Sequence, residues 1–222
     1  SLIGRRIESV EIKNAKLKLT VNAGGIALDI LTSKIFKSSI SSATIENRST
    51  TADGFVGGIV SRVSSSSRII ACRVEDLNFN CSSTNTTFGL IAGHASDSLI
   101  QNNAIKLKDG ATYGSGTFAF TIGKYGTGLK LFETQIFFSA SGEEHTSDGT
   151  GIKYKLIGSG DTNAVADLKF ENLNIVTSKA SQLTEDNIKS FVKYSETGSS
   201  YAVKGFLITN NGVGGATTNY QD

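Results

Sequence analysis

The sequence predicts an all-β chain folded as a parallel β-helix, a solenoid of about six coils, with one short α-helix added. Two patterns predict this fold: a hydrophobic spacing that recurs along the 222 residues, and Gly-rich aliphatic stretches that precede it. The composition agrees, because the chain has no Pro, Trp or Met but has 24 Gly. Short strands joined by polar, Gly-containing turns have this composition.

The recurrent spacing sets one large apolar residue five positions before a second apolar residue. The pairs are Ile7/Ile12, Ile40/Ile45, Ile69/Val74, Ile100/Ile105, Leu131/Ile136 and Phe170/Ile175, and their first members lie 33, 29, 31, 31 and 39 residues apart. This period indicates a structural unit repeated along the chain. We expect the first members to stack in one interior column and the second members in another. Because five is odd, a bend or bulge must separate the two if both point inward.

A Gly-rich, β-branched stretch precedes five of the six pairs. These stretches cover residues 25–30, 55–60, 88–93, 118–123 and 152–158, and a further copy covers 201–208. Each repeat therefore predicts two or three short strands, which in the third unit are Phe55–Val60, Ile69–Val74 and Leu77–Asn80. The intervening polar segments, among them Ser61–Arg68, are predicted loops and the expected contact regions of the protein.

Two other β architectures fit the repeat less well. Blades of a β-propeller usually run about 40 residues with aromatic signatures, whereas these units are shorter and contain no Trp. An antiparallel sandwich gives no reason for repeats in register. We therefore predict one solenoid domain over residues 1–222, and the start at Ser1 without Met suggests a mature product or a fragment of a longer protein.

One segment departs from the strand pattern. Residues 181–195 are predicted to form a helical insertion, with the helix itself at about 184–194. Thr184 suits an N-cap position, and Ile188, Phe191 and Val192 form an apolar stripe at helical spacing. Packing on the solenoid and binding a partner are both compatible with this stripe.

Charge and hydropathy exclude several function classes. The 22 basic and 20 acidic residues nearly balance, and no basic cluster exceeds Arg5-Arg6, so we expect no nucleic-acid partner. No apolar run is long enough to span a bilayer, and no signal peptide opens the chain. The Gly-rich segments match neither a P-loop nor a dinucleotide-binding fingerprint. We accordingly predict no cofactor.

The chain has two cysteines, Cys72 and Cys81. Cys72 lies three positions after Ile69, where a small buried residue fits, and free cysteines commonly have this role. A Cys72–Cys81 disulfide is the alternative. Neither interpretation implies catalysis.

Two segments resemble the GLUG-type repeat of bacterial and protist surface proteins. Gly57-Gly58-Ile59-Val60 followed by Ile69-Ile70-Ala71-Cys72-Arg73-Val74 is one copy, and Gly89-Leu90-Ile91-Ala92-Gly93 with Ile100-Gln101-Asn102-Asn103-Ala104-Ile105 is a second. The resemblance covers about a quarter of the chain, and further degenerate copies follow by spacing. It implies a secreted or surface-exposed β-solenoid, often an adhesin-like stalk, and carries over no catalytic residue.

Parallel β-helices also include polysaccharide lyases and hydrolases, so an enzyme is the alternative. Gly93-His94 resembles an element of the pectin hydrolases, but the paired aspartates that such an enzyme needs are missing, and Asp97 stands alone. His94 and His145 lack neighbours at metal-ligand spacing, so no metal site is predicted. The scattered aspartates, including Asp29 and Asp161, do not form a calcium-binding repeat. We predict no catalytic residue.

Three Asn residues head sequons for N-glycosylation, Asn47, Asn80 and Asn85, which matter only if the source is a eukaryote. They are expected in accessible turns. Taken together, the sequence predicts a non-catalytic extracellular or cell-surface module for attachment or assembly. Its expected partners are other copies or domains of the same surface protein, together with surface glycans. A phage or viral receptor-binding fibre is a further alternative.

Overall fold

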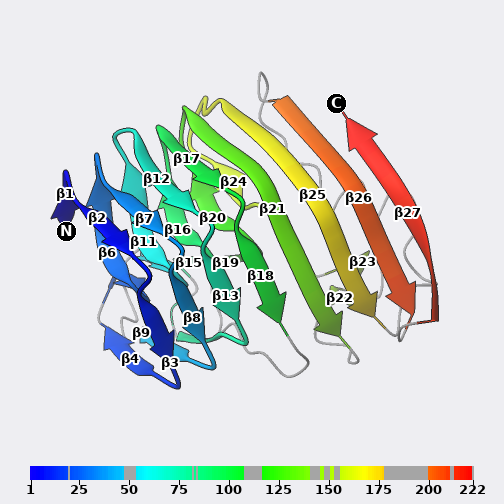
Figure 1. Cartoon of the computed structure of the whole chain (residues 1–222), viewed down its shortest axis with the longest axis horizontal. Helices are drawn as coiled ribbons and strands as arrows, with labels where there is room; N and C mark the ends of the chain where they lie inside the picture. Colours follow the sequence, from blue (N-terminus) through cyan, green and yellow to red (C-terminus); the bar gives the residue numbers. More distant parts are fainter. Residues whose placement is uncertain are drawn as a thin grey trace.

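The computed structural model describes residues 1–19, 21–47, 54–81, 83, 85–107, 117–140, 146–147, 151–152, 156–177, 200–210 and 213–221. These residues form strands stacked as a parallel β-solenoid (Figure 1). The predicted fold class is confirmed. The predicted helix at about 184–194, and the insertion 181–195 around it, lie outside the described residues. Within the described part, no helix is long and apolar enough to cross a membrane.

Four parallel sheets run along the solenoid, and we name them A to D. Sheet A contains, in spatial order, β1 (Leu2–Ile3), β6 (Ala27–Leu31), β11 (Val60–Ser64), β16 (Ala92–Ala95), β20 (Ile122–Tyr125) and β24 (Ser159–Gly160). Sheet D contains β5 (Ala23–Gly24), β10 (Gly54–Gly57), β15 (Thr86–Gly89) and β19 (Thr117–Ala119). Sheet C contains β4 (Lys16–Leu19), β9 (Thr44–Asn47) and β14 (Asn78–Cys81).

Sheet B is the largest and consists of two rows. The first row is β2 (Arg6–Glu8), β7 (Lys34–Phe36), β12 (Ser67–Ile70) and β17 (Ser98–Gln101). The second row is β3 (Glu11–Lys13), β8 (Ser39–Ser41), β13 (Arg73–Glu75) and β18 (Ala104–Leu107). The long strand β21 (Leu129–Ala140) pairs with the last strand of both rows, and β25 (Ala166–Thr177) and β26 (Ser200–Asn210) continue in parallel.

The last strand of sheet B, β27 (Val213–Gln221), pairs antiparallel with β26. A separate antiparallel pair joins β22 (Thr146–Ser147) to β23 (Gly151–Ile152). Sheet C has only three described strands and sheet D four, so the solenoid makes about four turns. The prediction of six coils was therefore too high, because the last long strands add to sheet B without described partners in sheets C and D.

The five-residue spacing is explained by a sharp corner between consecutive strands. Ala71, two residues after Ile69, has a φ of +55°, and Asn102, two residues after Ile100, has a φ of +52°. A single left-handed residue turns the chain, so the apolar residues on both sides of it point into the core. The predicted bend is confirmed by these corners, and Ile69, Val74, Ile100 and Ile105 are all buried.

The predicted interior columns were only partly right. The first column is Ile7, Ile35, Ile69, Ile100, Leu131 and Leu168, and the second contains Ile12, Ile40, Val74, Ile105 and Ile136. Thus Ile40 belongs to the second column and Ile45 to a third, beside Leu17. Buried isoleucines recur at 30, 35, 40 and 45, so the five-residue spacing alone does not fix the register of this coil. In the ladder Leu131 pairs with Leu168 and Ile136 with Leu173, so Phe170 and Ile175 do not hold the register positions predicted for them.

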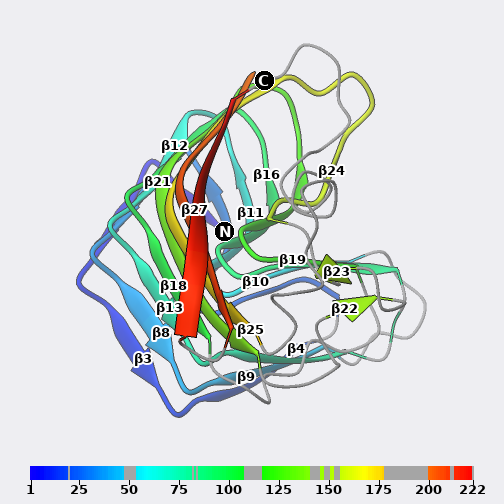
Figure 2. The same ribbon diagram turned by 90° about the vertical axis from the view of Figure 1, so that its right-hand side faces the viewer.

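Seen along the solenoid, the cross-section has two arms (Figure 2). In one arm sheet A lies opposite the first row of sheet B, and in the other sheet D lies opposite sheet C. Aromatic residues fill the second arm, where Phe79 of sheet C lies 5.2 Å from Phe88 of sheet D between ring centroids. Sheets A and D meet at an inside corner, so their outer faces border a concave region of the surface.

Candidate functional site

The inside corner between sheets D and A depends on glycine. Gly57 ends β10, and a Cβ atom built on it would collide with the carbonyl oxygen of Val60 and the backbone nitrogen of Gly93. Only the absence of a side chain allows the chain to turn this closely. Across the corner, the hydroxyl of Ser61 donates a hydrogen bond of 2.7 Å to the carbonyl oxygen of Phe55. The glycines that the sequence marked as a repeat thus bring the outer faces of the two sheets together.

A row of charged side chains runs along the outer face of sheet A. Asp29, Arg62, His94 and Lys124 occupy one register position in four successive strands, β6, β11, β16 and β20. Neighbouring strands lie about 4.8 Å apart, so the row follows the solenoid axis with that spacing. We call these four residues, together with Asp161, the groove row.

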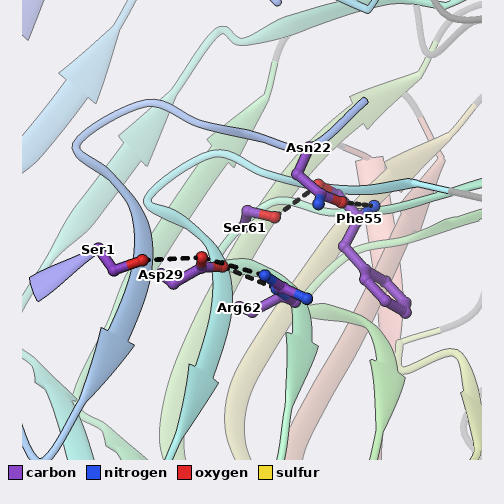
Figure 3. Close-up of polar contacts among 6 residues, drawn as sticks. All are labelled: Ser1, Asn22, Asp29, Phe55, Ser61 and Arg62. Carbon is purple, nitrogen blue, oxygen red and sulfur yellow. Dashed lines mark hydrogen bonds and ion pairs between the residues drawn. The ribbon is translucent and has the colours of Figure 1, made fainter. Parts of the chain in front are cut away.

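At one end of the groove row, Asp29 and Arg62 form a bidentate ion pair. The Arg62 Nε and a terminal guanidinium nitrogen donate to the two Asp29 oxygens at 2.7 and 3.0 Å, and the Ser1 hydroxyl donates at 3.1 Å (Figure 3). The hydrogen bonds from Arg62 outweigh burial and hold the pKa of Asp29 below its usual range. The same pairing raises the pKa of Arg62. Both groups are therefore charged at neutral pH.

At the other end, Asp161 joins two residues of the groove row. One of its carboxylate oxygens lies 2.9 Å from His94 Nε2 and the other 2.9 Å from Lys124 Nζ. Burial raises the pKa of Asp161, but the hydrogen bonds from His94 and Lys124 outweigh it and lower the pKa overall. This carboxylate fixes the orientation of both neighbours.

A groove of about 500 Å³ lies over this face of the solenoid. It is lined by Ser1, Asp29, Leu31, Arg62, Val63, Ser64, His94 and Ser96. The ring of Phe55, on the outer face of sheet D, packs against the imidazole of His94 with 5.1 Å between centroids. The side-chain oxygen of Asn22 accepts a hydrogen bond of 2.9 Å from the backbone nitrogen of Phe55 (Figure 3). Phe55 is half-buried and lies beside the polar row, next to the groove.

The groove offers donors and acceptors but few means of catalysis. Asp29 lies on β6, and Asp161 directly follows β24, four strands further along sheet A. The Asp161 carboxylate reaches back to His94 on β16 and Lys124 on β20, so roughly two to three strand spacings, about 10–14 Å, separate the two carboxylates. Paired carboxylates in glycoside hydrolases are usually about 5–9.5 Å apart. Over the described ranges, no group of three or more His, Cys, Asp or Glu could hold a metal ion. The arrangement suits recognition of a polar ligand better than acid–base chemistry.

Cys72 lies inside the solenoid, away from the groove. Its side chain is 3% exposed and carries a free thiol, whose pKa is raised by burial. Cys72 lies at the corner between β12 and β13, where its backbone nitrogen donates a hydrogen bond of 2.8 Å to the side-chain oxygen of Asn103 in the next coil. This agrees with the interpretation of Cys72 as a small core residue. The side chain of Cys81 lies outside the described residues.

Two of the three sequon residues lie in strands of sheet C, and the third directly precedes a strand of sheet D. Asn47 ends β9 and Asn80 lies within β14, so these two are in strands and not in the predicted turns. Asn85 precedes β15, and both Asn80 and Asn85 are exposed. The side chain of Asn47 lies outside the described residues. Use of the sequons stays a prediction.

Most residues of the groove were not singled out from the sequence. The predicted loop Ser61–Arg68 is mostly strand, and Arg62 within it is the central residue of the groove row. Asp29, one of the scattered aspartates of the sequence, lies in β6. The one available signal was the register of the Gly-rich stretches, which puts a polar residue five positions after Gly24, Gly57 and Gly89.

Of the two histidines, His94 lies in the described part of the chain and His145 does not. His94 lacks a carboxylate neighbour in the sequence, yet the fold brings Asp161 to it from 67 residues away. His145 lies outside the described residues. Asp97 occupies an exposed corner with a φ of +38° and accepts a hydrogen bond from the backbone nitrogen of Ser66. Asp97 is therefore part of a turn.

Comparison of the chain with protein-family models, with curated proteins and with solved structures found no match.

Proposed function

We propose that this chain is a non-catalytic structural or adhesive module of an extracellular or cell-surface protein, which mediates attachment or assembly. The observation that carries the proposal is the open edge of the first coil. Strands β1, β2, β3 and β4 each pair on one side only within the described part of the chain. Unpaired strand edges are templates for another β-layer.

The side chains at this edge favour such pairing. Leu2, Ile7, Ile12 and Leu17 belong to the core columns but are only partly buried, because no described coil covers them. Another coil stacked in register would complete their burial, at about 25 cal/mol per Å² of apolar surface removed from water. The proposed partners are other copies, or other domains, of the same surface protein. The GLUG-type resemblance is consistent with this stalk-like role and stays a proposal.

The proposal is tested by the assembly state of the purified chain. We expect sedimentation velocity to show concentration-dependent association and negative-stain images to show end-to-end particles. Ile7→Lys and Ile12→Lys place a charge in two half-exposed columns at the open edge and should weaken association at least tenfold. The control is Val165→Lys, because Val165 is 44% exposed and lies far along the solenoid from this edge.

A monomer at every concentration, or association that ignores the edge variants, would overturn the assembly proposal. The enzyme alternative has its own test, in which neutral and acidic polysaccharides are incubated with the chain and new chain ends are measured. Cleavage that is lost in Asp161→Asn would replace the proposal with a carbohydrate-active enzyme.

A further inference from the structure

The groove over sheet A has chemistry that the assembly role does not use. Its lining combines an ion pair, an imidazole and several hydroxyls, and the half-buried ring of Phe55 stands beside it. A concave site with convergent polar groups and some apolar surface is the usual form of a ligand site. The groove reaches the first coil only at Ser1, and its other lining residues belong to the next three coils.

Charge restricts what this groove can bind. Arg62 and Lys124 are the two permanent cations of the groove row, and each is already paired with a carboxylate, at 2.7 Å to Asp29 and 2.9 Å to Asp161. Among the side chains of the groove row, the two carboxylates therefore balance the two permanent cations. An acidic polymer would have to compete with these internal ion pairs, and a basic polymer would have to do the same. The balance therefore favours an uncharged ligand.

The polar groups of the groove suit a ligand rich in hydroxyls. Among the residues that line the groove, Arg62 donates, the carboxylate of Asp29 accepts, and Ser64 and Ser96 can do both. A hydroxyl group of the ligand can donate one hydrogen bond and accept another, so a single hydroxyl can bind an Asp and an Arg side chain at the same time. Hydrogen bonds to charged groups contribute more than those between neutral partners. The side chain of Leu31, which lines the groove, supplies apolar contact for the carbon-bound hydrogens of such a ligand, and the ring of Phe55 packs beside His94.

The geometry also indicates an extended ligand. The groove row repeats along the solenoid axis with a spacing of about 4.8 Å per strand. A linear polymer can place a repeating chemical group against each successive strand. We propose that the groove over sheet A binds a segment of an uncharged linear polysaccharide, held by Asp29, Arg62 and His94 with Phe55 beside them.

This inference rests on the proposed adhesive function and names the ligand class for it. The test is isothermal titration calorimetry, in which the full chain is titrated with neutral hexasaccharides of glucose, xylose, mannose and N-acetylglucosamine. We expect saturable binding of at least one hexasaccharide, with the disaccharide of the same sugar bound at least tenfold more weakly. Binding should change little between low and high salt, because no net charge is involved.

Two variants place the binding in the groove. Arg62→Gln removes the central donor, and Ser64→Tyr fills the groove without changing its charge. Each should weaken binding by roughly tenfold or more, the effect of losing about 1.4 kcal/mol. The controls are Arg68→Gln and Ser41→Tyr, which alter an exposed Arg and a half-buried Ser on sheet B. Thermal melts check that all four variants fold.

Three outcomes would overturn the inference: no hexasaccharide binds, binding is unchanged in both groove variants, or only acidic chains bind and salt removes them. The assembly measurement is independent, because the groove variants leave the open edge of the first coil intact. Association without glycan binding would refute the groove inference alone. Glycan binding without association would refute the assembly proposal alone.

Discussion

Arg62 donates two hydrogen bonds to Asp29, 33 residues earlier in the chain and directly beside it in the stacked coils. The parallel register sets this distance, since one turn of the solenoid returns the chain to the neighbouring strand. The pair lines the groove over sheet A, and the side chain of Asp29 is only 12% exposed. Stability and binding therefore depend on the same two residues.

We expect the Asp29–Arg62 pair to stabilise the fold above about pH 5 and to lose its effect in acid. The pKa of Asp29 is lower in the folded chain than its usual value, so the unfolded chain binds more protons around pH 4. The contribution is present above the unfolded pKa and is lost as the pH falls through the folded pKa. Urea unfolding at pH 7 and at pH 3 should show a smaller loss of stability in Asp29→Asn than in the wild type.

The size of this effect should be modest. The side chain of Arg62 is 47% exposed, so solvent screens the pair, and we expect about 1 kcal/mol or less at pH 7. A double-mutant cycle with Asp29→Asn and Arg62→Gln isolates the interaction. A coupling energy indistinguishable from zero at pH 7 would contradict the interpretation of this contact as stabilising.

We predict that Lys124 lowers the pKa of Asp161. Burial raises this pKa, while the hydrogen bonds from His94 and Lys124 lower it more. Lys124→Gln removes one donor and a charge, so the pKa of Asp161 should rise. Carbon-13 NMR of the labelled carboxyl groups measures the titration directly. Lys130→Gln is the control, because Lys130 is exposed on sheet B, and an equal shift in both variants would contradict the assignment.

Gly57→Ala should be among the most damaging single substitutions. The added Cβ would collide with backbone atoms of Val60 and Gly93, which cannot move without disturbing the ladder between β11 and β16 in sheet A. We expect a loss of about 3 kcal/mol or more, or failure to fold. Gly4→Asn is the control, because a Cβ there meets nothing within 4 Å and Asn tolerates the φ of +62°. Urea unfolding of both variants decides the point.

Cys72 should react with alkylating reagents only when the chain unfolds. The thiol is buried and its pKa is raised, so the reactive thiolate is both scarce and inaccessible. Peptide mapping after native and denaturing alkylation gives the labelling of Cys72 and Cys81 separately. Labelling of Cys72 in urea that requires a reductant would instead support the Cys72–Cys81 disulfide.

The sequence was sufficient for the fold class because the stacked side chains of a solenoid repeat. Ile69 and Ile100 recur at the same place in their units and do stack, as predicted. The register of the second coil was not predictable in the same way, because Ile35 and Ile40 are both suited to the interior position below Ile69. The ladder selects Ile35, whose partner across the corner is then Ile40.

The groove was much harder to predict than the core. His94 and Asp161 are 67 residues apart, and nothing in their local sequence marks them as neighbours. Their contact depends on the lengths of the turns between β16 and β24, which vary from coil to coil. Arg62 was not predicted as a site residue for a different reason, because Ser61–Arg68 is rich in serine and resembles a loop. In the fold, Ser65 and Ser66 form a tight corner, Ser61 lies at the inside corner beside Phe55, and the other two serines lie in strands.

The corner residue Ala71 gives a last prediction. Ala71 has a φ of +55°, a conformation that costs a non-glycine residue about 1–2 kcal/mol, and its backbone nitrogen donates to the carbonyl oxygen of Gln101 in the next coil. Ala71→Gly relieves this strain but adds about 0.5–1 kcal/mol of backbone entropy to the unfolded chain, so a net gain of up to about 1 kcal/mol is expected. Ala71→Val should destabilise, because a β-branched side chain resists this φ.

Asn102 is the matched control for this corner. It holds the equivalent position one coil further on, with a φ of +52°, and its backbone nitrogen donates to the carbonyl oxygen of Phe132. Asn adopts the left-handed region with less strain than Ala, so Asn102→Gly should gain less than Ala71→Gly. Urea unfolding of the four chains measures the difference. Equal changes at both positions, or a loss in Ala71→Gly, would mean that corner strain does not limit the stability of this solenoid.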